Sequence, residues 1–193
     1  MKRRVKKNKI NKKLLITAAA VLFTLLIAAL VIWIASVRAS RAEIITEVNR
    51  FALKHKLPAA LVCAVIEQES SFNPFARGRA GEIGLMQLMP PGTPGAPEEW
   101  ARIHRVKCPP GWKLYRIDMN INIGCWYLAR ALKKWRRYRC STELALIEYN
   151  AGAKHANLCK PDTFDGEVIP RIKIASTKKY VTEIMENYRD NLR

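Results

Sequence analysis

Residues 57–74 read LPAALVCAVIEQESSFNP, and this stretch decides the fold. Within it Glu69 lies four residues after Val65 and three after Ile66, which places its side chain on the apolar face of an α-helix. A proline in the first turn is compatible with a helix start, and the proline at the far end favours an end there. The stretch therefore predicts a helix with one carboxyl group on its apolar face.

A carboxyl group held against apolar neighbours loses the hydration of its charged form, so we expect the pKa of Glu69 to be raised. A carboxylic acid with a raised pKa can donate a proton near neutral pH, as the cleavage of a glycosidic bond requires. On spacing alone, a structural role near the helix end explains Glu69 equally well. Glu67 projects to another face of the same helix and is predicted to be solvated.

The chain has 193 residues and a formal charge of +18, and the charge is unevenly spread. Residues 1–13 carry eight basic side chains and no acid, which leaves about +10 for the rest. Residues 14–37, LLITAAAVLFTLLIAALVIWIASV, contain no charge. As a helix this segment would measure ~36 Å, against a hydrocarbon core of ~30 Å. It predicts one tilted transmembrane helix.

Because the basic residues lie on the N-terminal side of that segment, the positive-inside rule predicts a cytoplasmic tail and an exported C-terminal part. A cleaved signal peptide is the alternative, but the apolar run exceeds the ~7–15 residues of a signal-peptide core. The predicted organisation is a basic cytoplasmic tail at 1–13, a signal-anchor at 14–37, a linker helix at 38–57 and a domain at 58–193. We therefore expect a single-pass protein of the inner (cytoplasmic) membrane, with its domain on the periplasmic or cell-wall side.

Helical spacing recurs after the apolar segment, and no useful length of β-alternation or internal repeat interrupts it. The proline- and glycine-rich residues 90–97 are predicted to form a loop. Ser141 is predicted to cap a helix that ends near Gly152. The fold class is therefore all-α, with helices predicted at 39–56, 58–70, from 97 onward, 119–138, 141–150 and 179–192.

Five cysteines follow the apolar segment, and an odd number leaves at least one thiol unpaired. Cys63 and Cys125 have apolar surroundings and are predicted to be small buried hydrophobic residues. A bridge among Cys108, Cys140 and Cys159 is compatible with an exported domain, and the sequence leaves the pairing open. Neither cysteine nor histidine spacing indicates a metal site, so no metal and no cofactor are predicted.

Four short motifs resemble the signatures of the soluble lytic transglycosylase catalytic domain, in that family's order. The segment IEQESSFNP at 66–74 is similar to its first signature, and GLMQLMP at 84–90 to its second. Asn122-Ile123-Gly124 followed by Tyr127-Leu128 resembles the motif of its central helix. EYNAG at 148–152 is similar to its third signature. The resemblance implies an all-α, lysozyme-like fold of the goose-type lysozyme and lytic transglycosylase kind, with a sugar-binding cleft.

The resemblance also implies roles for individual residues. Glu69 would be the sole catalytic acid and base, with Ser70 beside it. Met86 and Gln87 would line the sugar cleft, and Tyr149 and Asn150 would lie beside the catalytic carboxyl. Glu167, in a weaker C-terminal match, is the remaining substrate-binding candidate.

Two positions and one C-terminal element depart from the family pattern. Glu82 replaces a residue that is usually small, and it is predicted to face water rather than bind substrate. Glu148 also stands where a small residue normally precedes the Tyr-Asn pair. An element of the form acid-Thr-Arg-x-Tyr-Val is degraded to STKKYV at 176–181, about three residues late, which puts the contacts of this segment in doubt.

The implied function is cleavage of the glycan strands of peptidoglycan without water, which leaves 1,6-anhydro-muramic acid ends. A lysozyme-type hydrolase of the same fold and a non-catalytic peptidoglycan-binding module of a secretion or division apparatus are the alternatives. The positive charge suits the acidic groups of peptidoglycan, and partners in the cell envelope are left open. A nucleic-acid partner is not predicted, because no platform of aromatic and basic residues is visible in the sequence.

Overall fold

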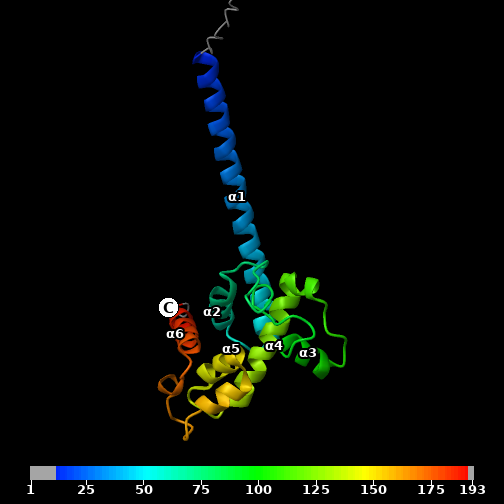
Figure 1. Ribbon diagram of the computed structural model, residues 1–193, viewed down its shortest axis with the longest axis vertical. Helices are drawn as coiled ribbons and strands as arrows, with labels where there is room; N and C mark the ends of the chain where they lie inside the picture. The colour runs from blue at the N-terminus through cyan, green and yellow to red at the C-terminus, as the bar shows by residue number, and fades with distance from the viewer. Residues whose placement is uncertain (1–11, 191–193) are drawn as a thin grey trace, which may run out of the picture. The chain divides into compact units, whose positions relative to one another are not determined.

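The computed structural model describes the backbone of residues 12–190, together with their side chains except at 12–15, 17 and 32–40 (Figure 1). The predicted basic tail therefore lies almost entirely outside the described residues. The all-α prediction is confirmed: in the described part of the chain the only β-type pairing is two isolated bridges, Arg77 with Ile83 and Ile83 with Leu88. The elements in chain order are α1 (Lys12–His55), α2 (Ala59–Ser70), α3 (Ala96–His104), the 3₁₀ helix η1 (Gly111–Tyr115), α4 (Ile117–Trp135), α5 (Ser141–Cys159), the 3₁₀ helix η2 (Ile169–Arg171) and α6 (Ala175–Asp190).

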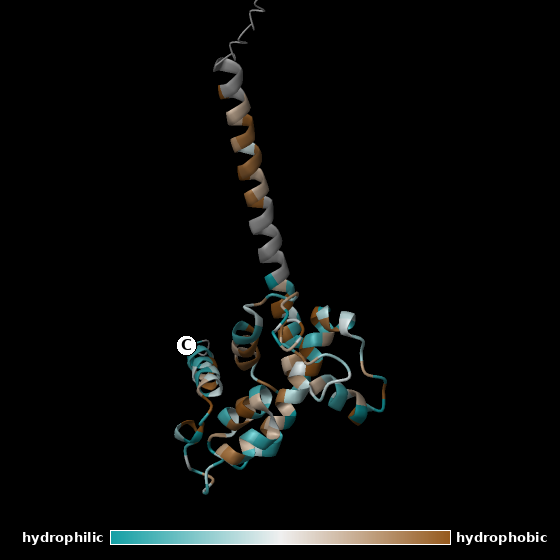
Figure 2. Cartoon of the chain, viewed as in Figure 1, coloured by the Kyte–Doolittle hydropathy of each residue, from teal (hydrophilic) through white to brown (hydrophobic). Residues whose placement is uncertain are grey.

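The chain divides into two compact units, residues 1–42 and residues 43–193. In the first unit the large apolar side chains that are described between residues 16 and 31 are all exposed. Figure 2 colours this part of the α1 ribbon mostly brown, the colour of hydrophobic residues. Part of the predicted transmembrane segment lies outside the described side chains. Within the residues that are described, no helix combines the length and hydropathy that crossing a membrane requires.

The second unit begins with the last turns of α1. Ile44, Val48, Phe51 and Ala52 are buried there, at the spacing of one helical face. The segment predicted as a linker helix thus contributes to the core of the domain. It is also not a separate helix, because α1 continues through it from Lys12 without a break.

The helix predicted from the opening stretch is α2, and it buries Val62, Val65 and Ile66. It ends at Ser70 because Ser71 adopts a left-handed conformation with φ of 49°, and the Ser71 N–H donates to the Glu67 carbonyl at 2.9 Å. This termination turns the chain into the loop that carries residues 83–88.

The later helices differ from prediction mainly at their ends. Ser141 is the first helical residue of α5 rather than its cap, since Cys140 occupies the capping position. Gly152 interrupts α5 with a φ of 82°, as predicted, but helical structure resumes as far as Cys159. The last helix, α6, begins at Ala175, four residues earlier than predicted. Cys108, Cys140 and Cys159 form no disulfide bond with one another, and Cys125 is buried as predicted, whereas Cys63 is only half-buried.

A close approach between α4 and the 83–88 loop depends on Gly124. A Cβ atom at this position would collide with the Sδ of Met86 and lie 2.9 Å from its Cβ. A glycine here lets the buried Met86 side chain pack directly against the α4 backbone.

Replacing Gly124 by Ala is therefore expected to destabilise the domain by about 1–3 kcal/mol through overpacking. The urea midpoint followed by circular dichroism measures this loss. Gly111→Ala is the matched control, because its Cβ would meet nothing closer than Ile83 Cδ1 at 3.6 Å. Equal midpoints for the two variants would contradict the packing argument.

Candidate active site

Glu69 lies near the C-terminal end of α2, above the buried side chains of Val65 and Ile66. Its carboxylate is half-buried, and its Oε1 accepts a hydrogen bond of 2.6 Å from the Tyr180 hydroxyl. Glu67, two residues earlier, is exposed, as the helical spacing predicts. The helix thus separates one solvated carboxylate from one that is largely surrounded by protein.

The environment of Glu69 raises its pKa from 4.5 to about 7. Burial is the main cause because it disfavours the charged form, and the negative charge of Glu82 adds to it. The hydrogen bond from Tyr180 acts in the opposite direction by stabilising the carboxylate. The raised pKa expected from the sequence is confirmed, and near neutral pH the group can both give and take a proton.

Two side chains on one face of α6 reach this region. Tyr180 is buried and donates to Glu69, and Thr177, one turn earlier, donates through Oγ1 to the Oδ1 of Asn150 at 3.0 Å. Both belong to the degraded element at 176–181, so the threonine and tyrosine of that element still make contacts. Tyr180 was not among the predicted site residues, although the tyrosine of the STKKYV match was the signal that could have found it.

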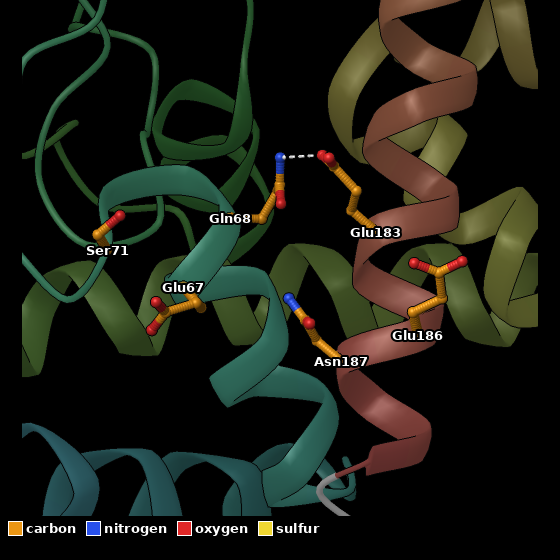
Figure 3. A pocket seen from close by; sticks show the side chains of 6 residues that line it. All are labelled: Glu67, Gln68, Ser71, Glu183, Glu186 and Asn187. Atoms are coloured by element: carbon orange, nitrogen blue, oxygen red, sulfur yellow. Dashed lines mark hydrogen bonds between the residues drawn. The ribbon is translucent and has the colours of Figure 1, made fainter.

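A second contact between α2 and α6 lies on the adjoining face of α2. Gln68 donates through Nε2 to the Oε2 of Glu183 at 3.0 Å, across a cavity lined by both helices (Figure 3). Together with the Tyr180 bond, this contact ties α6 to the end of α2 that carries Glu69. The residues that line the cavity are Glu67, Gln68, Ser71, Glu183, Glu186 and Asn187.

Tyr149, from α5, is half-buried, and its hydroxyl donates to the backbone carbonyl of Met86 at 2.8 Å. Burial holds the pKa of Tyr149 well above its usual range, and the charge of Glu69 raises it further. The electrostatic effect of Glu69 indicates that the tyrosine lies near the carboxylate. The side chain of Met86 is fully buried, so Met86 acts on the site through its backbone carbonyl.

The loop at 83–88 is fixed by Asn120, which is almost fully buried on α4. Its Nδ2 donates to the carbonyls of Ile83 at 2.9 Å and Leu114 at 2.7 Å, and its Oδ1 accepts from the Met86 N–H at 2.8 Å. Asn122, which belongs to the motif that resembles the family's central helix, is half-buried and accepts from Lys54 at 3.2 Å. Asn120, the asparagine that organises the loop, was not among the predicted site residues.

Ser70 also contacts this loop. Its Oγ lies 2.9 Å from the Leu85 carbonyl and 3.1 Å from the Ile66 carbonyl, to either of which it can donate. Through this hydroxyl the end of α2 is connected to the loop. Ser70 thus fixes the position of its neighbour Glu69.

Gln87 and Glu82 lie side by side against Gly78. A Cβ at Gly78 would collide with Glu82 Oε2 and approach Gln87 Oε1 to 2.8 Å. The Nε2 of Gln87 donates to the Gly84 carbonyl at 2.8 Å, and Glu82 Oε2 accepts from the Ala80 N–H at 2.9 Å. Glu82 is half-buried and its charge reaches Glu69, so it does not merely face water as predicted.

Glu148 is explained by a buried ion pair. Its Oε2 accepts from Lys134 Nζ at 2.7 Å and from Trp135 Nε1 at 2.8 Å, both on α4. A buried carboxylate with two charge-matched or polar donors is satisfied. Glu148 therefore joins α4 to α5 beneath the Tyr-Asn pair.

Glu167 is exposed and lines a different cavity, together with Arg139, Glu143 and Arg189. None of the residues that surround Glu69 lines that cavity. Four other candidates meet at the 83–88 loop, namely Ser70, Met86, Gln87 and Tyr149, whereas Asn150 contacts Thr177 of α6. Among the described residues there is no group of three or more His, Cys, Asp or Glu side chains that could hold a metal ion.

A comparison with known protein families identifies the family to which this domain belongs. The family described as "Transglycosylase SLT domain" matches residues 47–160, which include Glu69, the 83–88 loop and the Tyr-Asn pair. The chain belongs to this family. The SLT match begins inside α1, in agreement with the packing of the last turns of that helix into the domain.

Individual SLT relatives carry lytic murein transglycosylase names. The membrane-bound lytic murein transglycosylase E of Buchnera aphidicola is 30% identical over 141 residues, which are 72% of this chain and 62% of that protein. The soluble lytic murein transglycosylase of Escherichia coli strain K12 is 33% identical over 110 residues, 54% of this chain and 15% of that protein. The chain thus spans less than two thirds of the length of either relative.

Solved structures confirm the predicted lysozyme-like fold of the lytic transglycosylases. An inactive variant of the lytic transglycosylase Slt of Pseudomonas aeruginosa, with a glutamate replaced by glutamine, matches with a TM-score of 0.64 and 28% identity. The 70 kDa soluble lytic transglycosylase of Escherichia coli matches with a TM-score of 0.63 and 24% identity. Each match covers 76% of this chain and 24% of the other.

Removing the Tyr180 hydroxyl should raise the pKa of Glu69 above about 7, because the lost hydrogen bond favours the ionised form. In Tyr180→Phe the carboxyl stays protonated to higher pH, so a ¹³C-detected titration of Glu69 is expected to move upward. Tyr188→Phe, on the same helix, is the matched control and should leave the titration in place. A downward shift in Tyr180→Phe, or equal shifts in both variants, would count against the assigned role of the hydroxyl.

Proposed function

We propose that this SLT protein cleaves the β-1,4 bond between N-acetylmuramic acid and N-acetylglucosamine in peptidoglycan and leaves 1,6-anhydro-muramic acid ends. The observation that carries the proposal is Glu69, a half-buried carboxyl with a pKa of about 7 in contact with Tyr180. The names of the relatives support the substrate. The inactive glutamate-to-glutamine variant of the Pseudomonas aeruginosa enzyme supports a catalytic glutamate.

In the first step, protonated Glu69 donates its proton to the bridging oxygen as the bond between that oxygen and C1 of the muramic acid breaks. The N-acetylglucosamine leaves with a new hydroxyl group. The carbonyl oxygen of the muramic acid's own N-acetyl group bonds to C1 and carries the positive charge. A second carboxylate is not needed as a nucleophile, because the N-acetyl oxygen of the substrate takes that role.

In the second step, the ionised Glu69 takes the proton from the C6 hydroxyl of the same sugar. The C6 oxygen then bonds to C1, and the bond from the N-acetyl oxygen breaks. The product is the 1,6-anhydro sugar, and Glu69 is protonated again for the next cycle. A pKa of about 7 suits both steps, because the same group must be an acid first and a base afterwards.

The neighbouring residues are assigned by their contacts. Tyr149 is proposed to lie beside the reacting N-acetyl group, with its hydroxyl oriented by the Met86 carbonyl. Gln87 and Asn150 are proposed to contact the sugars, and Ser70 to hold the end of α2 in place. Glu167 is retained as a more distant substrate contact, on an exposed position by its own cavity.

Hydrolysis by the same fold is the second candidate function, and Glu82 is the observation that favours it. Its carboxylate is fixed by the Ala80 N–H, and its charge acts on Glu69. In a hydrolase with two carboxyl groups, such a residue would activate a water molecule that attacks C1. A non-catalytic binding module would need neither carboxylate.

We further propose that residues 14–37 anchor the protein in a membrane with the domain exported. Support comes from the large apolar side chains between residues 16 and 31, which are exposed on all sides of α1 without a polar face. A helix that is hydrophobic all round is typical of a membrane environment. The membrane-bound relatives are compatible with this location.

Mass spectrometry of fragments released from purified peptidoglycan by the whole chain tests the reaction. We expect fragments one water lighter than lysozyme products, and we expect Glu69→Gln to lower their release by ~10²–10⁴-fold. Glu67→Gln is the matched control, because Glu67 is exposed and lies on another face of α2.

Fragments that end in ordinary reducing sugars would make the protein a hydrolase, and Glu82→Gln should then lose activity as well. If the unmodified chain releases no peptidoglycan fragments, both enzymatic proposals are wrong and the binding module remains.

Alkaline carbonate extraction of bacterial membranes tests the anchor. We expect the chain to stay in the membrane pellet, and its intact mass to include residues 1–37. Replacing Leu25 and Leu26 together by Arg should release it, since each arginine at a helix centre costs ~2.5–3.5 kcal/mol of insertion free energy. Leu53→Arg, at a residue 82% exposed in the second unit, is the control. Release of the unmodified chain from the membrane pellet into the carbonate solution would contradict the proposal.

A further inference from the structure

A row of five aromatic rings runs from the candidate active site across the surface of α4 to α3. Each ring lies within 6.4 Å of the next, measured between centroids. The members are Trp100 and His104 (4.8 Å apart), Trp126 (5.6 Å from His104), Tyr127 (6.4 Å from Trp126) and Tyr149 (5.7 Å from Tyr127). We call this set the aromatic row.

The rings of the aromatic row differ in their exposure to solvent. His104 is exposed, whereas the other four rings are half-buried, and three of these (Trp100, Tyr127 and Tyr149) pack with one side against the core. Trp126 and Tyr127 are adjacent in α4, whereas Trp100 and His104 come from α3, which packs on α4 (Figure 1). Rings from three helices (α3, α4 and α5) thus form one series of neighbouring rings that the sequence does not show.

One end of the aromatic row is part of the candidate active site. Tyr149 donates to the Met86 carbonyl, and its pKa responds to the charge of Glu69. A chain molecule held at Glu69 and extended past Tyr149 would therefore meet Tyr127 next. The row continues the site instead of forming a separate one.

Polar groups accompany the rings. The Arg130 guanidinium lies 5.6 Å from the centroid of Trp126 and 5.9 Å from that of Tyr127. It is paired at 2.8 Å with Glu99, from α3. An Arg–Glu pair offers hydrogen-bond donors and acceptors next to aromatic faces without a net charge.

We propose that the aromatic row is a binding track for further sugar residues of a glycan strand, with the Arg130–Glu99 pair bonding to their hydroxyl and acetamido groups. This rests on the proposed function, since it takes the glycan held at Glu69 as its starting point. Sugar rings have apolar C–H faces that pack on aromatic rings, and an open row suits a linear polymer better than a closed pocket does.

Single-stranded nucleic acid is another polymer that binds to surfaces of aromatic and basic residues. The charges of the aromatic row favour the glycan. Arg130 is already neutralised by Glu99, whereas a phosphate backbone is bound through cations that remain available to it.

The test uses the whole chain carrying Glu69→Gln, so that binding is measured without cleavage. Affinity for soluble peptidoglycan glycan strands of defined length is compared with and without Trp126→Ala. We expect Trp126→Ala to weaken binding of long strands by about tenfold, the contribution of one well-packed aromatic contact, and to leave a disaccharide unaffected. Trp126→Phe, which keeps a ring, should restore most of the affinity and excludes a folding defect as the cause.

Trp112→Ala is the matched control, because Trp112 is 66% exposed and lies outside the aromatic row. Equal losses for Trp126→Ala and Trp112→Ala, or a loss that does not depend on strand length, would overturn the inference. Binding of a single-stranded oligonucleotide that Trp126→Ala abolishes while glycan binding persists would assign the row to nucleic acid. Failure of the proposed function is seen separately, as no cleavage by the unmodified chain.

Discussion

The site depends on the two hydrogen bonds through which Asn120 holds the loop at residues 83–88. This loop has no strand partner beyond isolated bridges, so its backbone groups need another source of hydrogen bonds. Asn120 satisfies the Ile83 carbonyl and the Met86 N–H from the interior of the domain. Ser70 from α2 and Tyr149 from α5 then bond to carbonyls of the same loop. One buried amide thus sets the positions of two elements that carry the candidate chemistry.

The neighbours of Glu69 act on the protonation of its carboxyl group in opposite directions. Burial and the carboxylate of Glu82 favour its neutral form, and the Tyr180 hydroxyl favours its ionised form. Their balance gives a pKa of about 7, where a single group can act as acid and as base. The environment of Glu69 is therefore suited to a reaction in which one carboxyl performs both proton transfers.

The domain also contains charges that the family pattern does not explain, and packing accounts for them. Glu148 is buried, yet Lys134 and Trp135 satisfy it, so it links α4 to α5 rather than acting on substrate. The Arg130–Glu99 pair links α4 to α3 in the same way, at the surface. The Arg130–Glu99 pair lies beside Trp126 and Tyr127 of the proposed glycan track, whereas Glu148 lies in the interior.

The sequence by itself determined the all-α class, the helix from residue 59 to 70 and the placement of Glu69 on its apolar face. These follow from local periodicity, which acts over three or four residues and needs no knowledge of the rest of the chain. Tertiary structure alone decided that Tyr180 contacts Glu69 across 111 positions of sequence, that Asn120 holds the loop, and that α3 and α4 share an aromatic row. Contacts between distant segments depend on how whole helices pack, and the spacing of residues along one helix carries no information about its partner.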